Sequence, residues 1–371
     1  MNGTDVMSAT LAAIVRGAAV VPPDDAADFL EAASHHGLRA LVAERLGSDL
    51  ERWPATARAQ LGRELALDSA LEALRERELE NVLKLLAARG VAALLLKGSA
   101  LAYTLYVRPE HRPRFDTDLL VSRDDMDVVA DVMLGRGYVR PGQVTGELVM
   151  HQLDYARQDS QGVWHVYDFH WKLANRQVVA GMLSREELTR ESIPIDALGP
   201  HARGLGHVHA LMLACVHRVA HHPSEERLIW IYDIHLLTEA LSPAEAESCA
   251  MLSVERSVRA LCVDGLAAAQ RWFGTRVPAA LLALAVNQPS AAAEPSAAFL
   301  DRGGGRALEL MSDLRALPEW SRRLRLLYEH AFPSPSYMRG MYMNANRAFL
   351  PALYTHRIVR GAWRLLRGGP R

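Results

Sequence analysis

The segment VAALLLKGSALAYTLY, residues 91–106, followed by RPRFDTDLLV, residues 112–121, decides the fold that we expect for this chain. The apolar run 91–96 is short enough for a buried strand, and Lys97-Gly98 marks the turn into a helix from Ser99 to about Val107. The second part ends in another apolar run, which predicts a second strand. A strand, a glycine turn, a helix and an acidic strand therefore follow one another.

Two aspartates of the second strand, Asp116 and Asp118, form the first candidate site. Because side chains alternate across a strand, we expect both on one face and Thr117 on the other. Two like charges side by side in an apolar strand are costly unless a cation or a donor compensates them. Their oxygens suit Mg²⁺, or Mn²⁺ in its place, held against a triphosphate. A structural explanation would instead need a partner such as Arg112 or Arg114.

A third carboxylate lies in a predicted hairpin of two strands, residues 147–157 and 162–171. Asp168 and His170 alternate with apolar neighbours and share one face of the second strand. If this strand pairs beside the one that carries Asp116 and Asp118, all three carboxylates converge. His170 could then orient Asp168, or it could be an ordinary buried histidine of the sheet.

The turn Lys97-Gly98-Ser99 is the candidate phosphate site, because it lies where a strand meets a helix. Backbone N–H groups and the helix N-terminus can receive phosphate oxygens there, and Gly98 permits close approach of the backbone. Lys97 could neutralise phosphate charge or simply end the strand at the surface. Arg112 and Arg114 could hold the triphosphate or balance the two aspartates.

Helical patterns flank this α/β segment on both sides. A long helix is predicted over residues 55–88, and a helix pair follows Gly206. We therefore predict an α+β fold in which a small mixed β-sheet core, residues 89–200, lies between two helical regions, residues 1–88 and residues 201–371.

The composition indicates which classes of partner and which compartment to expect for this protein. A formal net charge of -1 gives no basic excess of the kind that nucleic-acid binding requires, so we expect a small molecule or a peptide instead. The three cysteines have no CxxC spacing and indicate a reducing compartment. No uninterrupted apolar run reaches the ~18 residues of a membrane span. We expect a cytoplasmic protein with no membrane partner.

In their order these motifs resemble the nucleotidyltransferase signature of the DNA polymerase β-like superfamily. More narrowly, the chain resembles a bacterial family of uncharacterised nucleotidyltransferases, whose pattern couples KG and RPxxDxDLLV to a later DxHW strand. The family's HxxxH helix, its WxxD helix and its closing segment are also matched. These matches are Asp168, His170 and Trp171, then His217, His221, Trp230 and Asp233, and finally FPSPSYMR at residues 332–339.

The resemblance implies transfer of a nucleoside monophosphate from an NTP such as ATP to an unknown acceptor, with release of pyrophosphate. It implies that Asp116 and Asp118 bind Mg²⁺ and that Asp168 binds the catalytic ion and helps to deprotonate the acceptor. Gly98 and Ser99 would contact the nucleotide phosphates. The predicted nucleotide site also includes Lys97, Arg112, Arg114 and His170.

Two other functions stay open. The same site could transfer a phosphoryl or sugar group to a peptide or small metabolite in natural-product tailoring. The chain could also be a noncatalytic nucleotide-binding or toxin–antitoxin module, although the presence of all three carboxylates argues against this reading.

The residues His217, His221 and Asp233 have no clear role in the sequence alone. His217 and His221 have the spacing of a zinc-binding pair, but Arg218 and Val219 stand between them, so the general base of an HExxH motif is missing. We favour helix packing or closure over the nucleotide pocket. Asp233 is expected to bond within the helical layer, for instance to His217 or Arg227, and not to bind metal.

Overall fold

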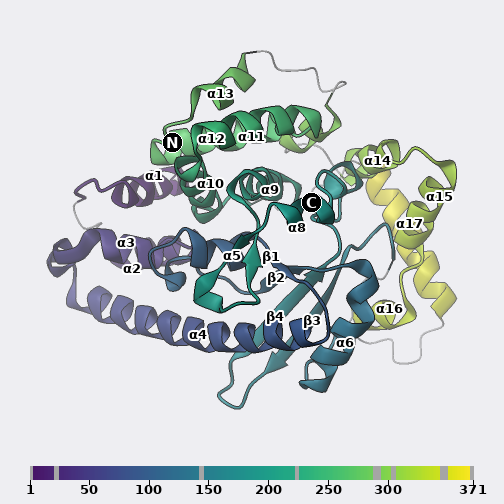
Figure 1. The fold of residues 1–371 in the computed structure, drawn as a ribbon, viewed down its shortest axis with the longest axis horizontal. Coiled ribbons are helices and arrows are strands. Elements are labelled where there is room, and N and C mark those ends of the chain that lie inside the picture. Colours follow the sequence, from purple (N-terminus) through teal and green to yellow (C-terminus); the bar gives the residue numbers. More distant parts are fainter. Residues whose placement is uncertain are drawn as a thin grey trace.

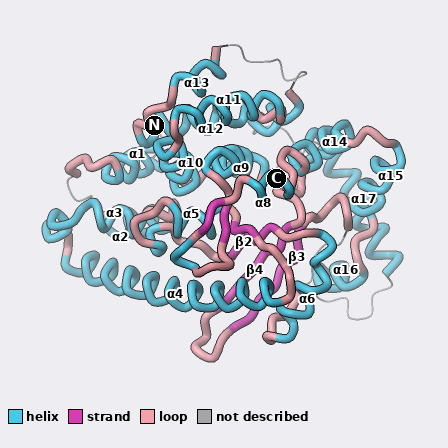
Figure 2. Tube along the Cα trace, viewed as in Figure 1, coloured by secondary structure: helices cyan, strands magenta, loops and turns pink. Residues whose placement is uncertain are grey.

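The computed structural model describes residues 3–20, 25–141, 146–221, 225–286, 294–301, 306–342 and 350–367. Helices flank a six-stranded mixed sheet on both faces (Figures 1 and 2), so the predicted α+β fold class is confirmed. Within the described ranges, no helix combines the length and the apolar character needed to cross a membrane.

The sheet has the strand order β3-β4-β2-β1-β6-β5. β2 runs parallel to β4 and antiparallel to β1, and β3 and β4 form the predicted hairpin. The short strands β5 and β6 were not predicted, because two residues show no periodicity. The strands are β1 Leu94–Leu95, β2 Thr117–Leu120, β3 Gln152–Gln158, β4 Trp164–His170, β5 Ile193–Pro194 and β6 Arg203–Gly204.

Strand β2 is buried along its whole length and separates two apolar cores. Leu119 belongs to the core that α4 (Ala55–Ala88) and α6 (Met126–Gly135) build on one face. Leu120 belongs to the larger core on the other face, together with Leu101 of α5 (Lys97–Thr104). Because side chains alternate, Asp118 faces the same side as Leu120 and therefore lies on the side of α5.

The larger core joins helices from both ends of the chain. Leu11 of α1 and Phe29 of α2 are fully buried in the same cluster as Val216 and Leu261. Figure 1 shows α1 beside α12. The predicted boundaries near residues 88 and 200 stay predictions. The helices concerned are α1 Gly3–Val15, α2 Ala26–His35, α3 Arg39–Leu46, α9 His207–Ala220, α10 Leu228–Ala240, α11 Pro243–Glu255 and α12 Arg259–Phe273.

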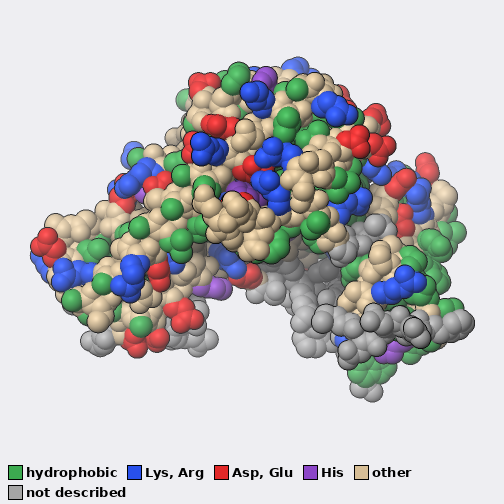
Figure 3. All heavy atoms as spheres, turned by 90° about the horizontal axis from the view of Figure 1, so that it is seen from below, with side chains coloured by type: hydrophobic (Ala, Val, Ile, Leu, Met, Phe, Trp, Pro, Cys, Tyr) green, Lys and Arg blue, Asp and Glu red, His purple; other side chains and the backbone are tan. Residues whose placement is uncertain are grey.

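The C-terminal helices dock onto the loop before β3 through one carboxylate. Glu329 accepts hydrogen bonds from the backbone N–H groups of Glu147, Leu148 and Val149 at 3.1, 2.8 and 3.1 Å. Exposed hydrophobic side chains gather on these helices, which form the right-hand part of Figure 3. The remaining helices are α7 Gln177–Ala180, α8 Arg185–Arg190, α13 Ala279–Leu282, α14 Arg306–Ala316, α15 Trp320–Ala331, α16 Pro335–Met341 and α17 Leu350–Arg367.

One buried histidine links the first helices to α10. Nδ1 of His36 accepts the backbone N–H of Leu228 at 3.4 Å, so Nε2 carries the proton that is donated to the hydroxyl of Ser8 at 3.1 Å. Burial, together with the nearby charges of His35 and Arg227, lowers the pKa of His36 to about 4. Protonation would remove the acceptor for Leu228, so the neutral form is the one that stabilises the fold.

We predict that His36 makes folding sensitive to acid. Its pKa is about 6.5 in the unfolded chain and about 4 in the folded chain, so stability is fully present above pH 6.5 and is lost as the pH falls toward 4. At pH 5 the loss should be about 2 kcal/mol. Urea unfolding of wild type and His36→Gln at pH 7 and pH 5 measures it. The stability difference between the two proteins should shrink at pH 5, whereas a constant difference would contradict this role.

Candidate active site

The two inner strands bring Asp118 and Asp168 side by side. Asp118 of β2 and Asp168 of β4 are register partners in the parallel pair, so their side chains leave the same face of the sheet. One possible ligand atom from each of Asp118, Asp168 and His170 lies within 4.8 Å of the other two. The strand pairing that the sequence required for convergence is therefore confirmed.

Asp118 is held by two nitrogen donors on a single oxygen. Nζ of Lys97 lies 2.7 Å from its Oδ1, and Nε2 of His170 donates to the same atom at 2.8 Å. Burial opposes ionisation, but the Lys97 ammonium and the His170 hydrogen bond outweigh it and place the pKa of Asp118 well below its ordinary value. The pKa of His170 is itself lowered by burial and by Lys97, which favours the neutral imidazole.

These contacts show which groups Asp118 binds. The cation that compensates it is Lys97, whereas Arg112 and Arg114 were the possible partners suggested from the sequence. His170 could have oriented Asp168 or been an ordinary buried histidine of the sheet, and its hydrogen bond is made to Asp118. The reason is the parallel register, which sets His170 opposite Leu120 and lets its ring reach back to the carboxylate two residues earlier on β2.

Asp168 stands among other carboxylates. Burial, followed by the charges of Asp154, Asp118 and Asp116, raises the pKa of Asp168 to about 8. Asp154 faces it across the β3–β4 hairpin, and Nε2 of Gln152 donates to both carboxylates at 3.0 Å. Asp154 was not among the predicted site residues, because its position opposite Asp168 depends on the register of the hairpin.

Asp116 is half-buried and lies in a bend directly before β2. Burial and the charge of Asp118 raise its pKa. Asp116 does not belong to the group of ligand atoms that lie within 4.8 Å of one another, so its predicted place as a metal ligand stays a prediction.

The crowding of carboxylates fits a divalent cation. The charge of the Lys97 ammonium acts on Asp116, Asp118 and Asp168, and burial together with repulsion between the carboxylates still raises the pKa values of Asp116 and Asp168. A divalent cation relieves such repulsion, and carboxylate oxygens are the ligands that Mg²⁺ prefers. Asp118 and Asp168, with Asp116 close by, are the residues that could hold it.

The first residues of α5 place Lys97 in contact with Asp118. Lys97 has a φ of 51°, in the left-handed region that residues other than glycine rarely adopt. Ser99 is buried, and its hydroxyl accepts the N–H of Asp118 at 3.1 Å and donates to the carbonyl of Asp116 at 3.5 Å. The Ser99 side chain therefore fixes the start of β2 relative to α5, which leaves backbone groups of this turn for the predicted phosphate contact.

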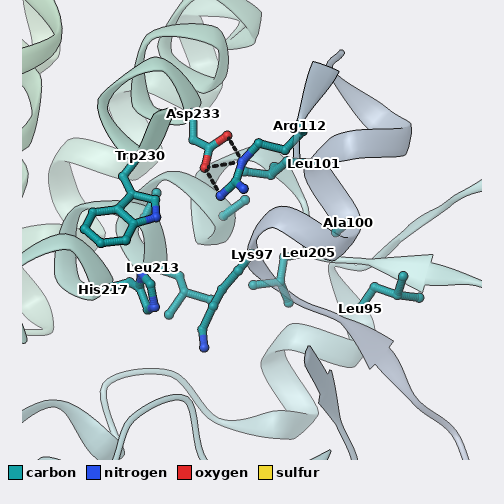
Figure 4. A pocket seen from close by; sticks show the side chains of 12 residues that line it. Leu95, Lys97, Ala100, Leu101, Arg112, Leu205, Leu213, His217, Trp230 and Asp233 are labelled. Atoms are coloured by element: carbon teal, nitrogen blue, oxygen red, sulfur yellow. Dashed lines mark hydrogen bonds and ion pairs between the residues drawn. The ribbon is translucent and has the colours of Figure 1, made fainter. Parts of the chain in front are cut away.

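Arg112 connects this turn to the helical layer. Its guanidinium binds Asp233 of α10 through Nε at 2.8 and 3.0 Å and through Nη2 at 2.7 Å (Figure 4). Tyr106 donates to the same carboxylate at 2.7 Å. The expectation that Asp233 bonds within its own layer was wrong. The guanidinium also lies so close to Gly98 that a Cβ there would stand 2.8 Å from its carbon.

Arg114 lies on the opposite side of β2. It forms a buried ion pair with Glu72 of α4 at 2.7 Å and donates to the hydroxyl of Thr117, which faces away from Asp118. The structure therefore brings Arg112 to the Lys97-Gly98 turn but separates Arg114 from the carboxylate group.

Most of the chain matches one known protein family. A family model described as uncharacterised nucleotidyltransferase matches residues 22–274, well over half of the chain. The chain belongs to this family. No curated protein matches the sequence. The matched part of this nucleotidyltransferase includes the sheet, the carboxylate group and helices α9 to α12, so it contains every candidate site residue.

We predict that Gly98→Ala destabilises the nucleotidyltransferase. The new Cβ would displace a guanidinium that three hydrogen bonds to Asp233 hold in place, at a cost of about 1–3 kcal/mol. Gly62→Ala is the matched control, because a Cβ there meets nothing within 4 Å and helix α4 should gain up to about 1 kcal/mol. Urea unfolding measures both variants. Equal stability of Gly98→Ala and wild type would show that Arg112 does not need this glycine.

Proposed function

We propose that this nucleotidyltransferase moves a nucleoside monophosphate from an NTP to an acceptor hydroxyl or phosphate and releases pyrophosphate, with Mg²⁺ or Mn²⁺ as the metal. The observation that carries the proposal is the convergence of Asp118 and Asp168 on neighbouring strands. Lys97 contacts Asp118 at the point where α5 begins.

The proposed roles follow from position and charge. Asp118, Asp168 and Asp116 would hold the divalent cation, which when bound supplies positive charge for the triphosphate and for the charge that develops in the reaction. The backbone N–H groups of Gly98 and Ser99, at the positive end of α5, would bind phosphate oxygens. Lys97 would hold Asp118 in place and add its charge beside the phosphates.

The proposed transfer is a single displacement at the α-phosphorus of the NTP. The acceptor oxygen forms a bond to the α-phosphorus, while the bond from that phosphorus to the bridging oxygen breaks and its electron pair leaves with pyrophosphate. The proton of an acceptor hydroxyl passes to the carboxylate of Asp168, which acts as general base. The product gains the mass of a nucleotide, whereas a gain of phosphate or hexose would identify one of the other transfer reactions.

Nucleotide binding tests the proposal without knowledge of the acceptor. Isothermal titration of the wild type with Mg²⁺ and each NTP should detect binding of at least one nucleotide. Asp118→Asn should weaken that binding by about tenfold or more, because a cation ligand and the partner of Lys97 are both altered. Asp131→Asn is the control, since the Asp131 side chain is 72% exposed on α6.

Two results would contradict the proposed function or the proposed site. If the wild type binds no NTP in the presence of Mg²⁺ or Mn²⁺, the enzymatic function is wrong. If Asp118→Asn binds nucleotide as tightly as Asp131→Asn does, the carboxylate group described here is not the nucleotide site.

A further inference from the structure

A pocket of about 360 Å³ lies between α6, the β3–β4 hairpin and α15. Pockets that bind small molecules in proteins have volumes of about 300–1,000 Å³, so this one has room for a small ligand. Most of its lining comes from the part that matches the family model, residues 22–274, whereas α15 lies outside that part. The pocket is therefore completed by a helix beyond the family match.

This pocket lies on the face of the sheet opposite to the carboxylate group. Leu153 of β3 lines it and is the register partner of Phe169, whose side chain packs in the core that α4 and α6 build. Trp171, directly after β4, lines the pocket and packs against the same core. Because side chains alternate along β4, Asp168 and His170 leave the other face. The pocket is thus separate from the proposed nucleotide site.

Part of the pocket lining is apolar. It includes Met126 and Ala130 of α6, Met150 and Leu153 around the start of β3, and Trp171. Methionine side chains are flexible and adapt to ligands of different shape. This part of the lining suits the apolar body of an organic molecule.

Two arginines add positive charge to the lining. Arg123 and Arg140 are exposed, and neither has an acidic partner within the ranges that the structure describes. The guanidinium carbon of Arg123 lies over the ring of Trp171, 4.5 Å from its centroid. A ring attracts a cation without accepting conventional hydrogen bonds from it, so the N–H donors of Arg123 stay available for a ligand.

The acidic groups of the pocket do not cancel these two arginines. Glu147 and Glu329 both bind Arg325, at 2.9 and 3.0 Å, and Glu329 also accepts three backbone N–H groups. Asp127 of α6 lines the pocket without an ion pair to any other described residue. The charges without a partner are therefore two guanidinium groups and one carboxylate, which favours an anionic ligand.

We propose that this pocket binds a small organic anion. Its carboxylate or phosphate group would be held by Arg123 and Arg140, and its apolar body would lie against the methionine and leucine side chains. Guanidinium groups bind such oxygens through charge-assisted N–H donors. The inference does not depend on the proposed transfer reaction, because neither arginine belongs to the predicted nucleotide site.

Phenylacetate and phenylacetamide are the probes that test this inference, because they share one ring and differ in charge. Saturation-transfer NMR titrations, without nucleotide or divalent metal, measure both affinities. The wild type should bind phenylacetate about fivefold or more tightly than phenylacetamide. Arg123→Ala and Arg140→Ala should each weaken phenylacetate binding by about fivefold and leave phenylacetamide binding nearly unchanged. Asp127→Asn removes a like charge and should strengthen phenylacetate binding.

Arg63→Ala is the matched control, since Arg63 is exposed on α4 and does not line the pocket. All three arginine variants should keep the urea unfolding midpoint of the wild type, because substitutions of exposed side chains change stability little. The inference is wrong if the wild type binds phenylacetate no more tightly than phenylacetamide. It is also wrong if Arg123→Ala and Arg140→Ala bind phenylacetate as Arg63→Ala does, or if they weaken both probes equally.

Discussion

The ion pair between Lys97 and Asp118 is the contact on which the arrangement of the site depends. Asp118 is buried in the central strand of the sheet, where an uncompensated carboxylate would be costly. Lys97 supplies the compensating charge from a left-handed backbone conformation at the start of α5. Ser99 then ties the same helix to the backbone of β2. The segment Lys97-Gly98-Ser99 thus keeps Asp118 ionised and places the N-terminus of α5 beside it.

A second buried ion pair connects the start of α5 to the helical layer. Arg112 packs against Gly98 and binds Asp233 of α10, so the turn and α10 share one rigid contact. Since Asp233 belongs to α10, the position of this helix depends on the same contact as the proposed phosphate site. Packing in the helices can therefore influence chemistry at the sheet, although the proposed metal ligands lie on β2, on β4 and in the bend before β2.

Sequence patterns predicted the fold class and the β3–β4 hairpin better than the contacts of the site. Alternation indicated which side chains share a face of each strand, but the convergence of Asp118 and Asp168 was expected only if their strands paired, as they do. Alternation does not fix the register of the β3–β4 hairpin, so Asp154 was missed. Ion pairs between residues that are distant in sequence could not be predicted either. Nothing local in the chain shows that Arg112 pairs with Asp233, 121 residues away.

The central claim is that Asp118 and Asp168 form a divalent-cation site. Anomalous X-ray scattering from crystals grown with Mn²⁺ and a non-hydrolysable NTP tests it most directly. We predict an anomalous peak in contact with the carboxylates of Asp118 and Asp168, next to the triphosphate. A nucleotide bound in the crystal with the peak at other residues, or with no peak at this pair, would contradict the account.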